Sequence, residues 1–181
     1  MNSNLDFKVV MQNKNLVAES TYNCIKNLYN EDEQKQFYVA EINPEYMDGI
    51  KLCEHYNIDI KAGVNCLICE CKRGDNKSYA ALLVPTGCKY NMSSTVRKHT
   101  NSRMVSVSPL DYVLKATGME YGSINPIGLP EEWKIFVDPK VFENDKIICG
   151  SGLQKSKILL PSKFLLKLKN VEILENLAKI D

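Results

Sequence analysis

The stretch VNCLICECKRGDNKSYAALLV, residues 64–84, does most to define the architecture of this chain. It contains two apolar runs, residues 64–71 and 79–84, with a polar segment between them. Both runs have the length and side chains typical of β-strands. The glycine-aspartate-asparagine sequence at residues 74–76 is typical of a tight hairpin turn. We therefore predict two strands joined by a hairpin turn.

The elements predicted around this hairpin mix strands and helices without strict alternation. Short strands are expected at residues 37–42, 104–107, 134–137, 146–149 and 156–160. Helices are expected at residues 14–29, from Pro44 onward, at residues 93–99 and 110–117, and from Pro161 onward. This order favours an α+β fold: one domain built on a sheet of mixed strand direction.

Helical periodicity predicts which faces of these helices are buried. The expected buried residues are Val17, Cys24 and Leu28 in the first helix, Met47, Ile50 and Cys53 in the second, and Leu110, Val113 and Leu114 in helix 110–117. Ser108 is placed to cap that last helix, and Gly118 stands where a left-handed C-terminal cap belongs.

The composition is that of an ordinary soluble globular domain. The chain has 181 residues, a formal net charge of +1, 44% hydrophobic residues and 25% charged residues, so bulk charge predicts no polyanionic partner. No run approaches the roughly 18 apolar residues of a membrane span, and residues 1–17 contain no signal-peptide core. The seven cysteines follow no disulfide framework. We therefore expect reduced thiols, a cytoplasmic location and no membrane partner.

Three closely spaced cysteines in the first predicted strand suggest a metal site at first sight. Because strand residues alternate between faces, Cys69 and Cys71 should point to one side and Cys66 to the other. The two histidines lie elsewhere, and a zinc site needs converging ligands. We therefore expect buried, inert thiols and no bound metal. The sequence also contains neither a GxSxG nucleophile elbow nor a GxxxxGK[ST] phosphate loop.

Two glycine-rich segments are candidates for a ligand-binding site. Residues 117–130, TGMEYGSINPIGLP, are too rich in glycine and proline for a regular helix or strand. Residues 150–152, Gly-Ser-Gly, lie between two predicted strands and can form an ordinary turn. Alternatively, two backbone N–H groups and a hydroxyl of this turn face the same cleft as the 122–128 loop, where they would suit a carbonyl oxygen that acquires negative charge.

A group of cations lies between these segments in the sequence. Lys89, Arg97, Lys98 and Arg103 fall within fifteen residues, and Lys155 and Lys157 follow the Gly-Ser-Gly turn. Such a group is either a solvated face or a rim that contacts phosphates. The sequence leaves both open.

Taken in order, several segments resemble one known family. The chain is similar to the YbaK/EbsC-type aminoacyl-tRNA deacylases, relatives of the prolyl-tRNA synthetase editing domain, in NCLICECK (65–72), YAALLVPTGCKYNMSSTVRKH (79–99), SPLDYVLKATG (108–118), TGMEYGSINPIGLP (117–130) and IICGSGLQKSKILLP (147–161). The resemblance extends over about residues 57–168. It implies a curved, mixed sheet flanked by helices, with residues 37–181 as the editing domain and residues 1–36 as an N-terminal helical extension.

The resemblance also implies a function. Members hydrolyse the ester of a mischarged aminoacyl-tRNA, generally one that carries a small amino acid. The implied partners are the 3′ end of an aminoacyl-tRNA and an aminoacyl-tRNA synthetase, with no cofactor and no DNA. The alternative is a binding module that holds aminoacyl-adenosine, a tRNA end or a nucleotide but has lost turnover.

Site residues follow by matching the family's motifs to this sequence. The implied catalytic residues are Asn65, Gly150, Ser151 and Gly152. The implied substrate-binding residues are Gly118, Gly122, Ser123, Pro126 and Gly128, with Ser123 standing where many members have glycine. The expected tRNA contacts are Lys89, Arg97, Lys98 and Arg103.

Position 65 departs from the family pattern. The family's functional lysine corresponds to Asn65, which offers a neutral amide where lysine would offer a cation. This departure favours the binding module, whereas the intact glycine segments favour the hydrolase, which we take as the leading hypothesis.

Overall fold

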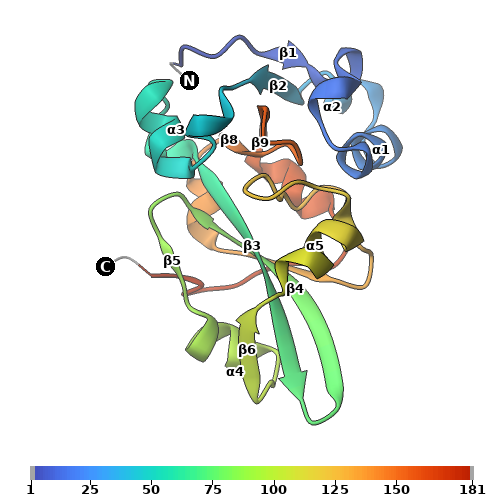
Figure 1. The fold of residues 1–181 in the computed structure, drawn as a ribbon, viewed down its shortest axis with the longest axis vertical. Coiled ribbons are helices and arrows are strands. Elements are labelled where there is room, and N and C mark those ends of the chain that lie inside the picture. Colours follow the sequence, from blue (N-terminus) through green and yellow to red (C-terminus); the bar gives the residue numbers. More distant parts are fainter. Residues whose placement is uncertain (1–2, 180–181) are drawn as a thin grey trace.

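The computed structural model describes residues 3–179 and contains two main β-sheets (Figure 1). The larger sheet has the strand order β10-β7-β4-β3-β6. Its strands are β3 (Val64–Arg73), β4 (Asn76–Pro85), β6 (Met104–Val107), β7 (Lys134–Val137) and β10 (Val171–Ile173). β7 pairs in parallel with β4 and β10, whereas β3 is antiparallel to β4 and β6. The predicted mixed sheet is confirmed.

The β3–β4 hairpin runs along the long axis of the molecule (Figure 1). Its ladder extends from Val64 opposite Pro85 to Arg73 opposite Asn76. The strands are longer than the two apolar runs because the polar residues on either side of the turn continue the pairing. The predicted hairpin is therefore confirmed, with a tighter turn than the sequence indicated.

The second sheet has the order β1-β2-β9-β8, and all its pairs are antiparallel. Its strands are β1 (Lys8–Val9), β2 (Tyr38–Glu41), β8 (Lys146–Gly150) and β9 (Ser156–Pro161). A bridge between Gly63 and Ile148 brings the start of β3 beside β8. The main hydrophobic core joins both sheets at this junction, with Val64, Ile147 and Ile158 almost fully buried. A small ribbon pairs β5 (Lys89–Tyr90) with β11 (Ala178–Lys179).

The helical segments are short and surround the two sheets. The α-helices are α1 (Glu19–Leu28), α2 (Glu31–Gln34), α3 (Gly49–His55), α4 (Arg97–His99) and α5 (Leu110–Thr117). The 3₁₀ segments are Val10–Gln12, Lys14–Leu16, Pro44–Tyr46, Ile60–Ala62, Pro139–Glu143 and Ser162–Lys167, and Met92–Val96 forms a π-helical turn before α4. Within residues 3–179, no helix is long and apolar enough to cross a membrane.

Two of the predicted buried helix faces are correct only in part: Val17 and Cys53 are buried as predicted, but one residue of each face is exposed. The α1 face buries Thr21 and Ile25, while Leu28 is 41% exposed. Likewise, Leu52 is buried in α3, while Ile50 is 46% exposed. In both places a 3₁₀ segment precedes the α-helix, so an α-helical period counted from the start of the predicted helix misplaces Leu28 and Ile50.

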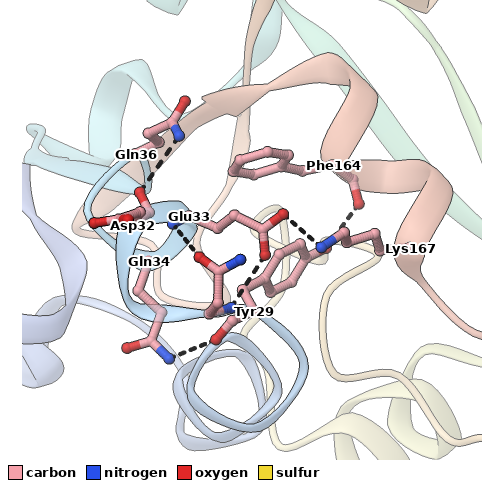
Figure 2. Close-up of polar contacts among 8 residues, drawn as sticks. Tyr29, Asp32, Glu33, Gln34, Gln36, Phe164 and Lys167 are labelled. Atoms are coloured by element: carbon pink, nitrogen blue, oxygen red, sulfur yellow. Dashed lines mark hydrogen bonds and ion pairs between the residues drawn. The ribbon is translucent and has the colours of Figure 1, made fainter.

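The described part of the N-terminal segment packs into the same core as the sheets. Val10 and Ile25 are fully buried in the main hydrophobic cluster. Figure 2 shows polar contacts between the N-terminal segment and the 3₁₀ segment Ser162–Lys167. The Tyr29 hydroxyl donates to the Phe164 carbonyl at 2.7 Å, and Lys167 forms an ion pair with Glu33. This segment is therefore held to the rest of the chain by both apolar and polar contacts.

Candidate functional site

A cavity of about 480 Å³ lies where β3, α3, β8 and β9 meet. In Figure 1, α3 lies at the end of the molecule where β3 begins, close to β8 and β9. The start of α5 and the loop that follows it complete the wall, through residues such as Ser108 and Gly122. The volume falls within the usual range of small-molecule pockets, about 300–1,000 Å³.

Asn65 lines this cavity from the second position of β3. Its Oδ1 accepts a long hydrogen bond of 3.4 Å from the Thr86 hydroxyl. The first residue of α3 is Gly49, and a Cβ there would lie only 2.8 Å from Asn65 Oδ1. The helix can therefore approach Asn65 only because residue 49 has no side chain.

Gly122 and Gly150 line the same cavity as Asn65, so the structure brings together one residue from each of the three predicted segments. Gly122 has φ of 75°, a left-handed conformation that glycine adopts without strain. A Cβ on Gly150 would lie 2.3 Å from the Ser123 carbonyl oxygen, so the 122–128 loop packs directly on the end of β8. At these positions, therefore, bare backbone forms the wall.

The structure corrects part of the prediction for the Gly-Ser-Gly turn. The Ser151 hydroxyl is fully buried and hydrogen-bonded to Ser156 Oγ at 2.8 Å and to the Leu153 carbonyl at 3.0 Å. The Gly152 N–H donates to the Ser123 carbonyl at 2.8 Å. These groups hold the turn together and join it to the 122–128 loop. Contrary to the prediction, they do not face the cavity.

The other predicted substrate-binding residues support the loop and lie outside the cavity wall. Gly118 ends α5 in the left-handed conformation, as predicted, with φ of 66°. Ser123 and Pro126 are buried, and a Cβ on Gly128 would lie 2.3 Å from the Ser20 carbonyl of α1. These positions hold the loop in place rather than contact a ligand in the cavity.

A buried asparagine anchors the loop to α1. Asn125 donates to the Thr21 hydroxyl at 3.0 Å and accepts from the Ile127 N–H at 2.8 Å. Thr21 in turn donates to the Ile127 carbonyl at 3.1 Å. The loop that presents Gly122 therefore depends on a residue of the N-terminal segment.

The most informative residue that the site prediction omits is Lys157 on β9. It lines the cavity, is only 5% exposed, and donates a hydrogen bond of 2.8 Å to the Met47 carbonyl. Burial lowers the pKa of its ammonium group. In the sequence it was grouped with Lys155 among cations expected on either a solvated face or a phosphate-contacting rim. The available signal was its position inside the apolar strand 156–160, where a solvated lysine is not expected.

Ser108 and Leu110 also differ from the sequence prediction. Ser108 lines the cavity and makes no capping hydrogen bond, and its buried hydroxyl has no hydrogen-bond partner among the described residues. Leu110, predicted to be buried, is 47% exposed at the mouth of the cavity beside Val107 and Tyr121. Exposed apolar side chains therefore form part of the rim.

The thiols of the cavity are poor nucleophiles. Burial raises the pKa of both Cys66 and Cys149, that of Cys149 to about 12. Cys69 and Cys71 lie on the other face of β3, as predicted, with their sulfur atoms 4.0 Å apart. Within the part of the chain that the structure describes, no cluster of histidine, cysteine and carboxylate side chains could hold a metal ion.

The predicted tRNA-contacting cations lie outside the cavity wall. Arg97 and Lys98 are exposed on α4, as expected, and Arg103 is exposed just before β6. Lys89 is exposed on β5, next to Tyr90, which does line the cavity. The structure thus places one of the four beside a residue of the wall.

The fold is an α+β domain with a cavity of small-molecule size whose wall is formed partly by backbone. The sequence model of the aminoacyl-tRNA editing domain matches residues 43–168. The chain belongs to this family, which confirms the resemblance found in the sequence and indicates an editing role.

Solved structures confirm the fold class. A putative trans-editing enzyme for prolyl tRNA synthetase superposes with a TM-score of 0.72 at 13% identity, covering 91% of this chain and 99% of that one. The hypothetical protein APE2540 superposes with a TM-score of 0.73 at 14% identity, covering 89% and 100%. Identities this low support the fold alone. A comparison with curated proteins finds no significant match.

Proposed function

We propose that the protein is a trans-editing hydrolase that cleaves the ester of a mischarged aminoacyl-tRNA carrying a small amino acid. The observation that supports this most directly is the convergence of Asn65, Gly122 and Gly150 on one cavity. These three residues come from the three segments that the family resemblance assigns to the site.

The chemistry suits a site of this kind. An aminoacyl ester is already activated, and the neighbouring ribose hydroxyl can help to orient or deprotonate the attacking water. The protein then mainly has to position the ester and supply hydrogen-bond donors to the developing oxyanion. The Asn65 amide is one such group, and the backbone at Gly122 and Gly150 allows the substrate to approach closely.

The dimensions of the cavity favour a small amino acid. A space of about 480 Å³ that also admits part of the terminal adenosine has little room for a large side chain. Ile124 and Ile148 add apolar surface to the wall. Because one methylene is worth only about 1–3 kcal/mol in discrimination, size exclusion is an effective basis for editing.

The proposed setting is the cytoplasm, with the 3′ end of an aminoacyl-tRNA as substrate and an aminoacyl-tRNA synthetase as a further partner. Lys89, Arg97, Lys98 and Arg103 are the proposed contacts to the tRNA. The apolar rim at Val107, Leu110 and Tyr121 offers a surface on which a base of the tRNA end can pack.

One observation favours a second candidate function. Asn65 provides no charge at the position where the family has its functional lysine, so a module that binds aminoacyl-adenosine without turnover is the alternative. A deacylation panel tests both. Purified protein is incubated with tRNAs charged with different amino acids, and release of each amino acid is followed over time. Binding of a 3′-amide analogue of aminoacyl-adenosine, which resists hydrolysis, is measured in parallel.

Hydrolysis of esters of small amino acids supports the hydrolase. Binding of the amide analogue without release of any amino acid supports the binding module. If the protein neither binds the amide analogue nor releases an amino acid, both functions are contradicted.

A further inference from the structure

Lys157 has an unusual environment for a lysine. It is 5% exposed on β9, where Ile158, Leu159 and Leu160 follow it into the interior. Lysines are almost never buried to this extent unless they are paired with an opposite charge. Within residues 3–179, the hydrogen-bond partner of its ammonium group is the Met47 carbonyl, and no carboxylate forms an ion pair with it.

The position of Lys157 directs this charge at the candidate site. It pairs with Gly150 across the β8–β9 ladder and lines the same cavity as Asn65. An ammonium group has three N–H donors, and Met47 occupies one of them. The remaining donors are available to a ligand in the cavity.

We propose that Lys157 is a catalytic residue that donates an N–H to the carbonyl oxygen of the scissile ester. The inference rests on the proposed function. The resemblance implies a lysine at position 65, and this chain has an asparagine there. Lys157 instead brings a positive charge into the same cavity from a strand of the other sheet.

The reaction is balanced without any further reactant. Water adds to the ester carbonyl carbon and loses a proton, and the carbonyl oxygen becomes an oxyanion beside the Lys157 ammonium. The bond from this carbon to the ribose oxygen then breaks. The ribose oxygen leaves as a hydroxyl group with the proton that the water lost, and Lys157 keeps its own proton throughout.

Burial favours a contact with the carbonyl oxygen over one with a phosphate. The phosphates of a tRNA end remain close to solvent, so they are best contacted by exposed lysines at the rim. Lys157 lies below the rim, where the lower dielectric strengthens its interaction with a developing oxyanion.

The pH dependence follows from the groups around Lys157. The titratable groups that act on its charge are Cys149 on β8, Asp48, which caps α3, and Cys53 on α3, with Cys66 also in the cavity wall on β3. Burial lowers the pKa of Lys157, while Cys149, Asp48 and Cys53 act in the opposite direction. Because the charged form is the active one, turnover should fall as pH rises through this lowered pKa. A neutral lysine that acted as a base would give the opposite slope.

The test compares Lys157→Met with wild type on the mischarged tRNA that wild type hydrolyses best. Methionine keeps most of the side-chain length and removes the charge. We expect kcat to fall about 100-fold or more, as when one oxyanion donor is removed. Binding of the 3′-amide analogue should change less than about threefold, since its carbonyl carries no full negative charge. Lys163→Met, at an exposed position after β9, is the matched control and should retain wild-type kcat.

A second variant keeps the test decisive if Lys157→Met unfolds. Lys157→Arg retains the charge, and its descending pH limb should move to higher pH because guanidinium stays protonated. A folded Lys157→Met with kcat within threefold of wild type would overturn the role of Lys157 alone. A descending limb of the pH profile that stays at the same pH in Lys157→Arg would overturn this role as well. If wild type releases no amino acid in the panel, the proposed function fails, and the role of Lys157 in turnover fails with it.

Discussion

The backbone N–H of Gly152 donates a hydrogen bond of 2.8 Å to the carbonyl oxygen of Ser123. A second bond, from the Glu120 N–H to the Gly152 carbonyl, has the same length. The turn after β8 and the loop after α5 therefore form one backbone unit. These bonds couple the loop that carries Gly122 to the turn that follows Gly150, and both glycines line the cavity.

Gly150→Ala should disturb both walls at once. The added methyl group would lie 2.3 Å from the Ser123 carbonyl oxygen, so the loop has to shift. We expect a loss of about 1–3 kcal/mol in the free energy of unfolding, the usual cost of overpacking, together with weaker binding of the 3′-amide analogue. Denaturant unfolding and titration with the analogue measure the two effects. Equal stability and affinity in the variant would show that the loop is not packed on β8 as described.

Gly122→Val should block the cavity while the rest of the fold persists. A Cβ at this position would meet the Met47 side chain at 3.0 Å, and a β-branched residue is strained at φ of 75°. We expect affinity for the amide analogue to fall at least about tenfold, that is, by at least about 1.4 kcal/mol. Isothermal titration measures the affinity, and circular dichroism checks the fold. Unchanged turnover in a folded variant would contradict the placement of the site.

Asn65 distinguishes the two candidate functions. If its amide hydrogen-bonds the substrate or the attacking water, Asn65→Ala should lower kcat by about 10- to 100-fold. Asn65→Lys should not raise kcat, because Gly49 leaves little room beside Asn65 and Lys157 already supplies a charge. Single-turnover deacylation measures both. Restored activity in Asn65→Lys, with an inactive wild type, would instead identify asparagine as the mark of a lost catalytic group.

Arg97 and Lys98 should contribute to tRNA binding through their charge. Replacing both by alanine should weaken binding and reduce the slope of log affinity against log salt by about 1.4, if each contacts one phosphate of a single strand. The measurement is filter binding across a salt series. The matched control is Lys26→Ala with Lys163→Ala, which removes the same charge from exposed positions elsewhere. The same slope in both double variants would show that α4 is only a solvated surface.

Local signals in the sequence predicted local features of the fold well. The β3–β4 hairpin and the left-handed cap at Gly118 follow from turn residues and apolar runs that act within a few positions. The glycine and proline content singled out the segments that carry Gly122 and Gly150, whereas Asn65 was found only through the family resemblance.

Tertiary context decided the features that the sequence did not predict. Lys157 is buried because α3 and Met47 cover this part of β9; its place in the apolar strand 156–160 indicates burial but does not specify what covers it. Leu110 is exposed because the first turn of α5 faces the mouth of the cavity instead of the core. The Ser151 hydroxyl bonds within its own turn because Ser156, five residues later, lies within reach.

The bond between Thr21 and Asn125 has a consequence for how relatives of this protein are compared. Thr21 precedes the segment 43–168 that matches the family, yet it supports the loop that carries Gly122. A chimera that exchanged only the matched segment between two relatives would place one protein's loop on another protein's helix. Differences in substrate choice could then be inherited from residues that an alignment of the matched segment never includes.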